Sequence, residues 1–258
     1  MAVQKTDAIV IGYYPLGEAD RIVVFYTRDH GKVRAVAKGI RKLKSRLCGK
    51  LELLTHGVLV FFERANSQLH IVDSFDITES FQTLREDLLK MAYCSYIAEL
   101  IGQIKPEGDP DPDTFDLIMN IMLMMKTSTD PEMLTRAFEI RLLTAEGLGP
   151  KLDSCAICSS GVDEKRIGFS VSAGGILCGK CSQLHPSVYS VSKGTIELMK
   201  RMQRTPISFI PRLKISALNR QELKKTLPDF ISFHVELGSL HSLDFLTSIE
   251  TEYKGRIW

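Results

Sequence analysis

Short apolar runs with a period of two fill the first eighty residues. The clearest covers residues 32–38, which read KVRAVAK. Successive side chains of a strand point to opposite faces, so this spacing places small apolar residues on one face and basic residues on the other. Similar runs predict strands at residues 8–11, 21–26, 57–62 and 69–72 as well.

Five short strands without a helical pattern between them are typical of a small barrel. Turn-forming sequences such as Asp29-His30-Gly31 separate the runs, because glycine accepts a positive φ and aspartate can bond its own backbone. The strand number and length fit a five-stranded OB-type β-barrel, and an SH3-like barrel would give much the same pattern. We therefore predict an N-terminal barrel domain at residues 1–80.

From Thr83 onward the apolar residues recur at helical spacing. The sequence from Thr83 to Glu86 has the form of a capping box, which predicts a helix that begins there and ends before Pro106. Further helices are predicted at 115–125, 130–146, 193–204, 219–231 and 241–249. Pro228 should kink or divide the helix that contains it. Residues 81–258 are thus predicted to form a helical domain, with a loose tail from Tyr253.

An acidic, proline-rich stretch separates the first two of these helices. Residues 107–113 read EGDPDPD. Proline disfavours helix and the acids repel one another, so a loop is expected. A metal site is one interpretation of the acids, but we favour a flexible linker.

Composition and length describe an ordinary globular chain. Of 258 residues, 44% are hydrophobic and 25% are charged, and two domains fit this length. The first residues lack a basic leader followed by a long apolar run, and no apolar run approaches a membrane span. We expect a cytoplasmic protein without a membrane partner, in which Cys48 and Cys94 are reduced.

The net charge of +2 conceals a densely basic segment. Between Arg28 and Lys50 the chain carries nine basic residues and one acid, Asp29. Lysine and arginine displace condensed counterions from a phosphate backbone, so such a segment beside a barrel favours nucleic-acid binding. A solvated loop is the alternative, since charge runs are usually that. Tyr13, Tyr14, Phe25 and Tyr26 lie nearby, and the sequence does not separate those that could stack on bases from those that fill the barrel.

The most specific signal is a pair of Cys-x-x-Cys motifs. Cys155 and Cys158 precede Cys178 and Cys181 by a 19-residue spacer that contains Gly174-Gly175. Four thiolates at this spacing suit a tetrahedral Zn²⁺ ion and leave no open position for a reactive water. Two disulfides or free thiols are the alternatives, and a reducing cytosol disfavours disulfides. We predict a structural zinc site inserted in the helical domain at about residues 150–187.

Motifs of enzyme catalysis are absent from the sequence. It contains no phosphate-binding glycine loop followed by Lys-Ser/Thr, no Gly-x-Ser-x-Gly and no His-Glu-x-x-His. The six histidines form no spaced set with carboxylates. We therefore predict a binding protein rather than an enzyme.

The order of these features resembles the RecO family of recombination-mediator proteins. The matching segments are Gly17 to Arg21, Gly31, the run VAKGIRKLKS from Val36 to Ser45, FEIRLL from Phe138 to Leu143, Gly147, Pro150, and the cysteine motifs with Gly174-Gly175. The resemblance covers nearly the full length and is weakest over residues 187–258.

The resemblance implies an α+β multidomain architecture, with an OB-fold domain followed by a helical domain that carries the zinc motif. It implies binding of single- and double-stranded DNA, annealing of complementary strands, and work with RecR, and often RecF, to load RecA onto DNA coated by single-strand-binding protein. The family's basic loop maps onto Lys38, Arg41, Lys42, Lys44 and Arg46, with Arg34 on the adjoining strand. These residues are the predicted DNA contacts, and the implied location is the nucleoid.

Two other functional classes remain as alternatives. One is a zinc-ribbon protein that binds RNA or a ribosomal complex, which would not need to anneal DNA. The other is an enzyme whose site the sequence does not reveal; a variant without turnover but with intact DNA affinity would support it.

Overall fold

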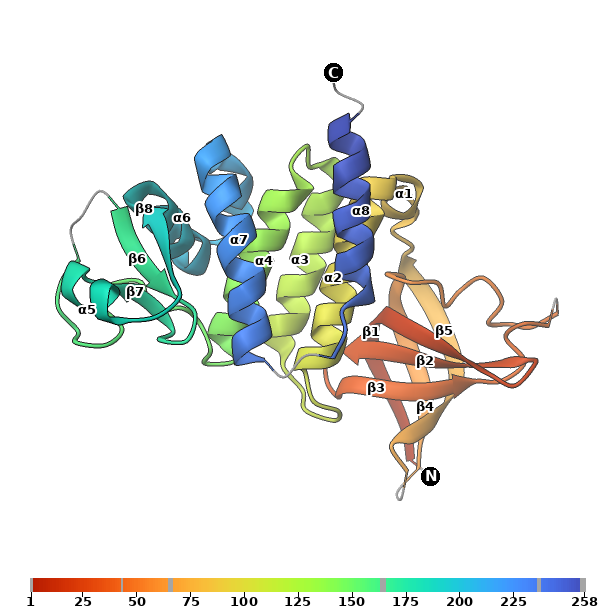
Figure 1. Ribbon diagram of the computed structural model, residues 1–258. Coiled ribbons are helices and arrows are strands. Elements are labelled where there is room, and N and C mark those ends of the chain that lie inside the picture. The colour runs from red at the N-terminus through yellow and green to blue at the C-terminus, as the bar shows by residue number, and fades with distance from the viewer. Residues whose placement is uncertain (1, 43, 65–66, 163–165, 236–237, 256–258) are drawn as a thin grey trace. The chain divides into compact units, whose positions relative to one another are not determined.

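The computed structural model describes residues 2–42, 44–64, 67–162, 166–235 and 238–255 (Figure 1). The chain divides into two compact units. The first comprises Met1–Thr127 together with Gly238–Trp258, and the second comprises Ser128–Leu237.

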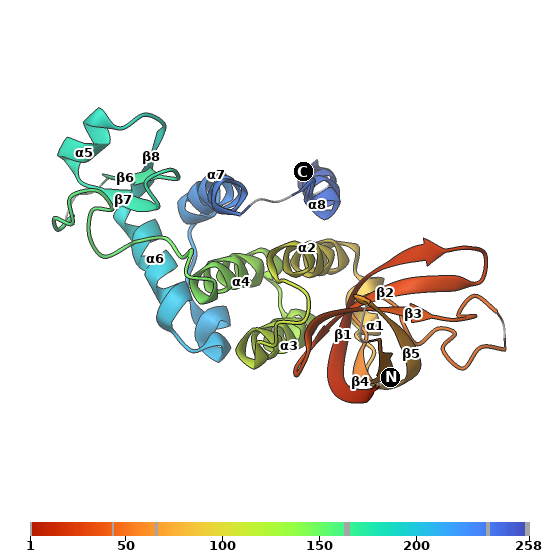
Figure 2. The same ribbon diagram turned by 90° about the horizontal axis from the view of Figure 1, so that it is seen from below.

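A five-stranded barrel begins the first unit. Its strands are β1 (Ala2–Leu16), β2 (Asp20–Thr27), β3 (Gly31–Ala37), β4 (His56–Glu63) and β5 (Leu69–Glu79). They pair in the order β1-β2-β3-β5-β4 and close through β1 and β4, as Figure 2 shows from below. Only the β3–β5 pair is parallel among these strands. The predicted five-stranded OB-type barrel is confirmed.

The period of two explains which side chains fill the barrel. Val23 and Phe25 of β2 face inward with Val33 and Ala35 of β3, and all four are buried. The ring of Phe25 lies 5.9 Å from that of Phe75 on β5. Intervening positions point outward, so the alternation seen in the sequence becomes the inner and outer faces of one sheet.

Four helices complete the first unit: α1 (Gln82–Glu86), α2 (Leu88–Ile104), α3 (Pro112–Thr127) and α8 (His241–Gly255). The predicted single helix from Thr83 is wrong, because Asp87 interrupts it with an extended backbone. The Asp87 carboxylate accepts hydrogen bonds from the backbone N–H groups of Leu89 and Lys90, which starts α2.

The last helix packs against α2, which lies far from it in the sequence (Figures 1 and 2). The Glu99 carboxylate accepts from the backbone N–H of Ser242 at 2.8 Å, and Tyr93 donates to Glu250 at 2.5 Å. Helix α8 extends to Gly255, so the start of the predicted loose tail is helical. Residues 256–258 of that tail lie outside the described residues.

The acidic stretch is held against the barrel, so the prediction of a flexible linker is wrong. The N–H of Gly108 donates to the carbonyl of Lys32 at 3.1 Å. At Gly31, which has a φ of +61°, an added Cβ would lie 2.1 Å from the carbonyl oxygen of Asp109. The close approach of this loop therefore requires glycine at position 31.

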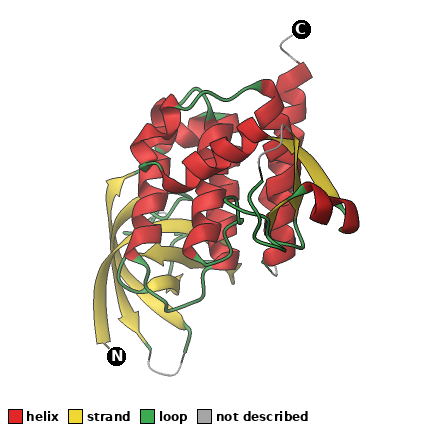
Figure 3. Cartoon of the chain, turned by 90° about the vertical axis from the view of Figure 1, so that its left-hand side faces the viewer, coloured by secondary structure: helices red, strands yellow, loops and turns green. Residues whose placement is uncertain are grey.

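The second unit combines helices with a small sheet (Figure 3). Its elements are α4 (Pro131–Ala145), β6 (Arg166–Ser170), β7 (Gly175–Leu177), α5 (Gly179–Leu184), β8 (Val188–Ser192), α6 (Lys193–Arg204), the 3-10 helix η1 (Ile207–Arg212) and α7 (Ala217–His234). The three strands pair antiparallel in the order β7-β6-β8. Helices carrying a four-cysteine insertion were predicted and are confirmed, whereas the sheet within the insertion was not predicted.

Helix α7 differs from its prediction in its first residue and in the effect of Pro228. It begins after Ser216, whose side chain forms a reciprocal capping box with Asn219, and not at Asn219 itself. Pro228 does not divide it. Phe230 and Ile231, which follow the proline, are 1% exposed, and their burial offsets the lost backbone hydrogen bond. Among the helices that the structure describes, none is both long and apolar enough to cross a membrane.

Candidate nucleic-acid interface and metal centre

The basic loop, residues 38–55 between β3 and β4, closes one end of the barrel. Ile40, Leu47 and Leu51 of this loop are at most 7% exposed and belong to the barrel core. The side chains of Lys38, Arg41, Lys42, Lys44 and Arg46 are exposed. The loop is therefore anchored by its apolar residues and presents its basic residues to solvent.

Successive turns fix the backbone of the basic loop. The N–H of Lys42 donates to the carbonyl of Gly39, and that of Ser45 donates to the carbonyl of Lys42, each at 2.9 Å. The N–H of Cys48 then donates to the carbonyl of Ser45 at 3.2 Å. Five cationic side chains thus extend from a folded segment, which lowers the entropic cost of binding a ligand through them.

Two hydrogen bonds tie this loop to the turn between β1 and β2. The N–H of Gly39 donates to the Asp20 carboxylate at 2.7 Å, and the N–H of Arg41 donates to the carbonyl of Ala19 at 3.1 Å. Gly39 has a φ of +65°, a conformation that favours glycine. The sequence motif Gly17 to Arg21 therefore has a structural role, positioning the basic loop, that the sequence alone did not reveal.

The charges of the basic loop are available to a ligand. Within the described part of the chain, no carboxylate forms an ion pair with Lys38, Arg41, Lys42, Lys44 or Arg46. Arg34, the sixth predicted contact, lies apart on the outer face of β3. Its Nε is 2.5 Å from Glu107 Oε1, and its guanidinium also donates to Gln68 at 3.4 Å. The structure thus brings together five of the six residues and gives Arg34 an acidic partner.

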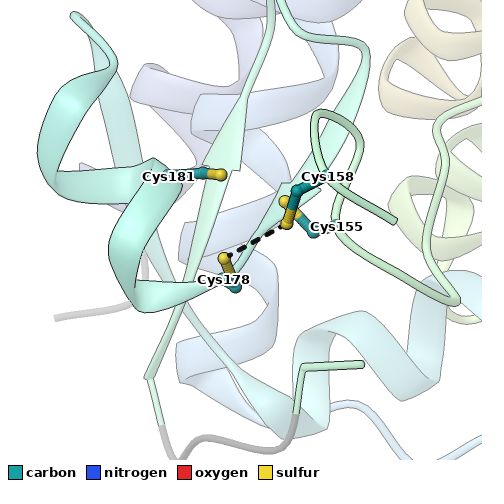
Figure 4. A group of neighbouring side chains, drawn as sticks. All are labelled: Cys155, Cys158, Cys178 and Cys181. Carbon is teal, nitrogen blue, oxygen red and sulfur yellow. Dashed lines mark hydrogen bonds between the residues drawn. The ribbon is translucent and has the colours of Figure 1, made fainter. Parts of the chain in front are cut away.

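The two cysteine motifs meet in the second unit, as Figure 4 shows. Cys155 and Cys158 lie in the loop after α4, Cys178 is the residue before α5, and Cys181 lies in its first turn. The four sulfur atoms lie within 4.8 Å of one another, and those of Cys158 and Cys178 are 3.7 Å apart. A Zn–S bond of about 2.3 Å gives a tetrahedral edge of about 3.8 Å, so the four sulfurs fit a zinc ion after small adjustments.

Backbone hydrogen bonds hold the motifs in place. The N–H of Ala156 donates to the carbonyl of Ile176 at 2.7 Å, which joins the first motif to β7. The N–H and carbonyl of Lys151 bond Gly174 and Ile176. A Cβ at Gly175 would lie 2.2 Å from the Lys151 carbonyl oxygen, so the Gly174-Gly175 pair permits this close approach.

Four neighbouring sulfurs cannot all ionise without a cation. Burial opposes ionisation of Cys155, but backbone N–H groups of Cys158, Cys178 and Ile157 outweigh it and lower its pKa to about 6. Burial, and then hydrogen bonds with the other three thiols, raise the pKa of Cys181 to about 12. A divalent cation would stabilise all four thiolates together.

Comparison with known proteins agrees with these features. Residues 1–81 match the family model described as recombination protein O N terminal, and residues 85–244 match recombination protein O C terminal. A protein named DNA repair protein RecO from Pelotomaculum thermopropionicum is 34% identical over 246 residues, which cover 95% of this chain and 94% of the relative. One of the same name from Symbiobacterium thermophilum is 33% identical, with 97% and 99% covered.

The match extends over both units and includes the barrel, the basic loop and the cysteine motifs. It confirms the family that the order of sequence features indicated. The chain belongs to the RecO family of recombination proteins.

Proposed function

We propose that this protein is a DNA-binding recombination mediator that acts in DNA repair. The observation that supports this most directly is the basic loop, five unpaired cationic side chains on a folded segment of an OB-type barrel. Its relatives carry the name DNA repair protein RecO. Residues 1–80 are the nucleic-acid-binding domain in this proposal, and residues 81–258 form the helical domain.

The basic loop binds the sugar–phosphate backbone. Lys38, Arg41, Lys42, Lys44 and Arg46 displace counterions from the phosphates, and Arg34 joins them when a phosphate displaces Glu107. Contacts of this kind carry no sequence information. They suit a protein that binds single- and double-stranded DNA regardless of sequence.

Strand annealing needs no covalent chemistry. Cationic side chains reduce the repulsion between two complementary strands, and base pairing supplies the driving force. The partners in this proposal are RecR, RecF and the single-strand-binding protein, and together they load RecA onto DNA. These partner assignments rest on family membership. The protein acts on DNA in the cytoplasm, at the nucleoid, and is not an enzyme.

Cys155, Cys158, Cys178 and Cys181 hold a structural Zn²⁺ ion in the same proposal. The separations of their sulfur atoms support this donor set. Four thiolates fill the coordination of zinc, so the ion stabilises the loop between α4 and α6 and has no position for a substrate.

The test is the salt dependence of binding to a labelled single-stranded oligonucleotide, followed by fluorescence anisotropy. The variant Arg41→Ala/Lys42→Ala/Lys44→Ala should bind more weakly, and the slope of log K against log salt should flatten by about 2, since each lost contact contributes about 0.7. A matched control, Arg201→Ala/Lys214→Ala/Lys225→Ala, removes the same charge from exposed residues of the second unit and should keep the wild-type slope.

The salt slopes distinguish the first two outcomes below, and a separate annealing assay distinguishes the third. Flattening in the control instead would place the DNA on the second unit. Equal slopes in all three proteins would contradict the role of the basic loop. Binding without annealing of complementary strands would favour an RNA-binding or ribosome-associated protein over a mediator.

A further inference from the structure

A groove of about 550 Å³ lies in the first unit, between the outer face of β1–β3 and helix α2. We call it the β1–α2 groove; its lining includes Gly12, Tyr14, Val24, Arg34, Glu99 and Gln103. None of the five exposed basic side chains of the basic loop lines it, but Leu53, near the end of that loop, does.

Small residues on both sides make room for the groove. Gly12 of β1 pairs with Val24 of β2, which pairs with Arg34 of β3, so these three form one row across the outer face. A Cβ at Gly12 would meet only Val24, at 4.0 Å, which is ordinary contact, and the space above it is open. Ala98 and Gly102 line the groove from α2.

Two tyrosines, Tyr13 and Tyr14, line the groove, and both are exposed. Tyr14 is 60% exposed, whereas Phe25 and Tyr26 are fully buried in the barrel. Tyr13 is 41% exposed, and the guanidinium of Arg21 lies 4.6 Å from its ring centroid. Because Arg21 already lies against Tyr13 and Tyr14 has the larger exposed fraction, Tyr14 is the ring best placed to stack on a base.

The polar groups of the groove do not favour a phosphate. Two cations and two carboxylates line it, and all four are engaged: Arg34 is held by Glu107, Lys32 Nζ donates to the carbonyl of Gly102 at 2.6 Å, and Glu99 accepts from the N–H of Ser242. Carboxylate and amide oxygens accept hydrogen bonds from the exocyclic amines of bases. Together with the ring of Tyr14 and the amide of Gln103, they suit a neutral planar group with donors on its edge.

The groove is close to the basic loop. Tyr14 pairs with Ile22, and Ile22 pairs with Val36 on β3, two residues before Lys38. Two interstrand spacings place Tyr14 about 10 Å from Val36. A single strand whose phosphates lie on the basic loop can therefore direct a base toward Tyr14.

We infer that the β1–α2 groove binds one unstacked nucleobase of single-stranded DNA, stacked on Tyr14. The inference rests on the proposed DNA binding and adds to it a contact that a duplex cannot make, because its bases are already stacked and paired. Phosphate contacts then supply affinity for any DNA, and the groove supplies the preference for single strands.

Three variants test the inference. Tyr14→Ala removes the stacking surface and should weaken binding of a single-stranded oligonucleotide about tenfold, while Tyr14→Phe keeps the ring and should bind as the wild type does. Gly12→Val fills the groove without removing a contact, and should weaken binding as Tyr14→Ala does. Gly12 lies in a strand without a positive φ, so valine is compatible with the fold; circular dichroism and thermal melting check this.

The probes separate a base contact from a phosphate contact. On an oligonucleotide of equal length that carries no bases, and on a duplex, Tyr14→Ala should bind as the wild type does, with an unchanged salt slope on every probe. An equal loss on the base-free probe, or no loss on the single strand, would overturn the inference. If the basic-loop variant still flattens the slope in that case, the proposed DNA binding stands without the base site; if the wild type binds no DNA, both fail.

Discussion

The carboxylate of Asp20 accepts the N–H of Gly39, and the neighbouring carbonyl of Ala19 accepts the N–H of Arg41. These two bonds join residues about twenty positions apart and orient the start of the basic loop. In the proposed DNA binding, the aspartate at the first position of β2 therefore acts through backbone geometry, although it adds a negative charge near the basic loop. Orienting the loop favours DNA binding more than the Asp20 charge opposes it only if the loop must be ordered before DNA binds.

Arg34 and Glu107 form an ion pair, and its removal should change the affinity for single-stranded DNA in a predictable direction. The Arg34 side chain is 41% exposed and that of Glu107 is 23% exposed, so the pair contributes about 0.2–1 kcal/mol. As a hypothesis, Glu107→Gln should raise the affinity for single-stranded DNA about two- to fivefold, because Arg34 no longer has to leave an acidic partner. The measurement is anisotropy at constant, moderate salt.

A double-mutant cycle separates this pair from the general effect of removing an acid. In an Arg34→Ala background, Glu107→Gln should raise affinity distinctly less than it does in the wild type. An equal rise in affinity in both backgrounds would show that Arg34 does not contact DNA, whether or not Glu107 is present.

At the scale of elements, Asp111 joins the end of α2 to the start of α3. Its carboxylate accepts from the backbone N–H of Thr114 at 3.0 Å, which caps α3, and from Lys105 Nζ at 2.7 Å. The Lys105 side chain is only 5% exposed, so its ion pair with Asp111 is largely shielded from water. Burial alone would raise the pKa of Asp111, but the hydrogen bonds from Lys105 and Thr114 outweigh it and hold the pKa at about 2.

This lowered pKa predicts an acid-dependent loss of stability. The ordinary pKa is 3.8, so the contribution of the ionised carboxylate is present above about pH 4 and is lost as the pH falls toward 2. The contribution is about 2 kcal/mol. Asp111→Asn should therefore lower the free energy of unfolding by about that amount at pH 7. The difference from wild type should shrink below pH 4, as urea unfolding across this range would reveal; a constant difference would contradict the assignment.

The sequence predicted elements well where one face is buried and the other is not. The runs at 21–26 and 32–38 alternate because the barrel has a distinct inside and outside, and both became strands of the expected extent. The strands of the cysteine insertion have only five, three and five residues, too few for a period to be recognised. The helix break at Asp87 was missed because Thr83 offered a competing capping signal.

The candidate site was predictable in composition but not in geometry. Nine basic residues between Arg28 and Lys50 are visible in the sequence, and five of the six residues predicted as contacts are exposed together. Their anchoring through Ile40 and Leu47, and the withdrawal of Arg34 toward Glu107, depend on contacts between distant segments. Periodicity carries no information on such contacts. The cysteine spacing did predict a cluster, because four ligands on two short motifs leave few other arrangements.

At the scale of the whole molecule, the chain leaves the first unit after Thr127 and returns to it at Gly238. The helix pattern near the C-terminus was recognisable, but its attachment to α2 through Glu99 and Tyr93 was not. As a result, the stability of the first unit depends on α8, a segment that lies far from α2 in the sequence. The second unit, with its cysteine cluster, is an insertion between two parts of the first.

The proposed zinc ion can be tested on the full chain by its effect on each unit. As a hypothesis, Cys178→Ser should abolish stoichiometric zinc binding, measured by atomic absorption, and lower the melting temperature, because a structural zinc site contributes on the order of several kcal/mol to the fold around it. Cys48→Ser, which changes an exposed cysteine outside the cluster, is the matched control and should keep the wild-type zinc content and melting temperature.

Because the basic loop lies in the first unit and the cluster in the second, the Cys178→Ser protein should retain the wild-type salt slope for single-stranded DNA at temperatures below its melting temperature. Unchanged zinc content and melting would refute the metal site. A flattened slope in a variant that remains folded would instead assign the cysteine insertion a direct part in binding DNA.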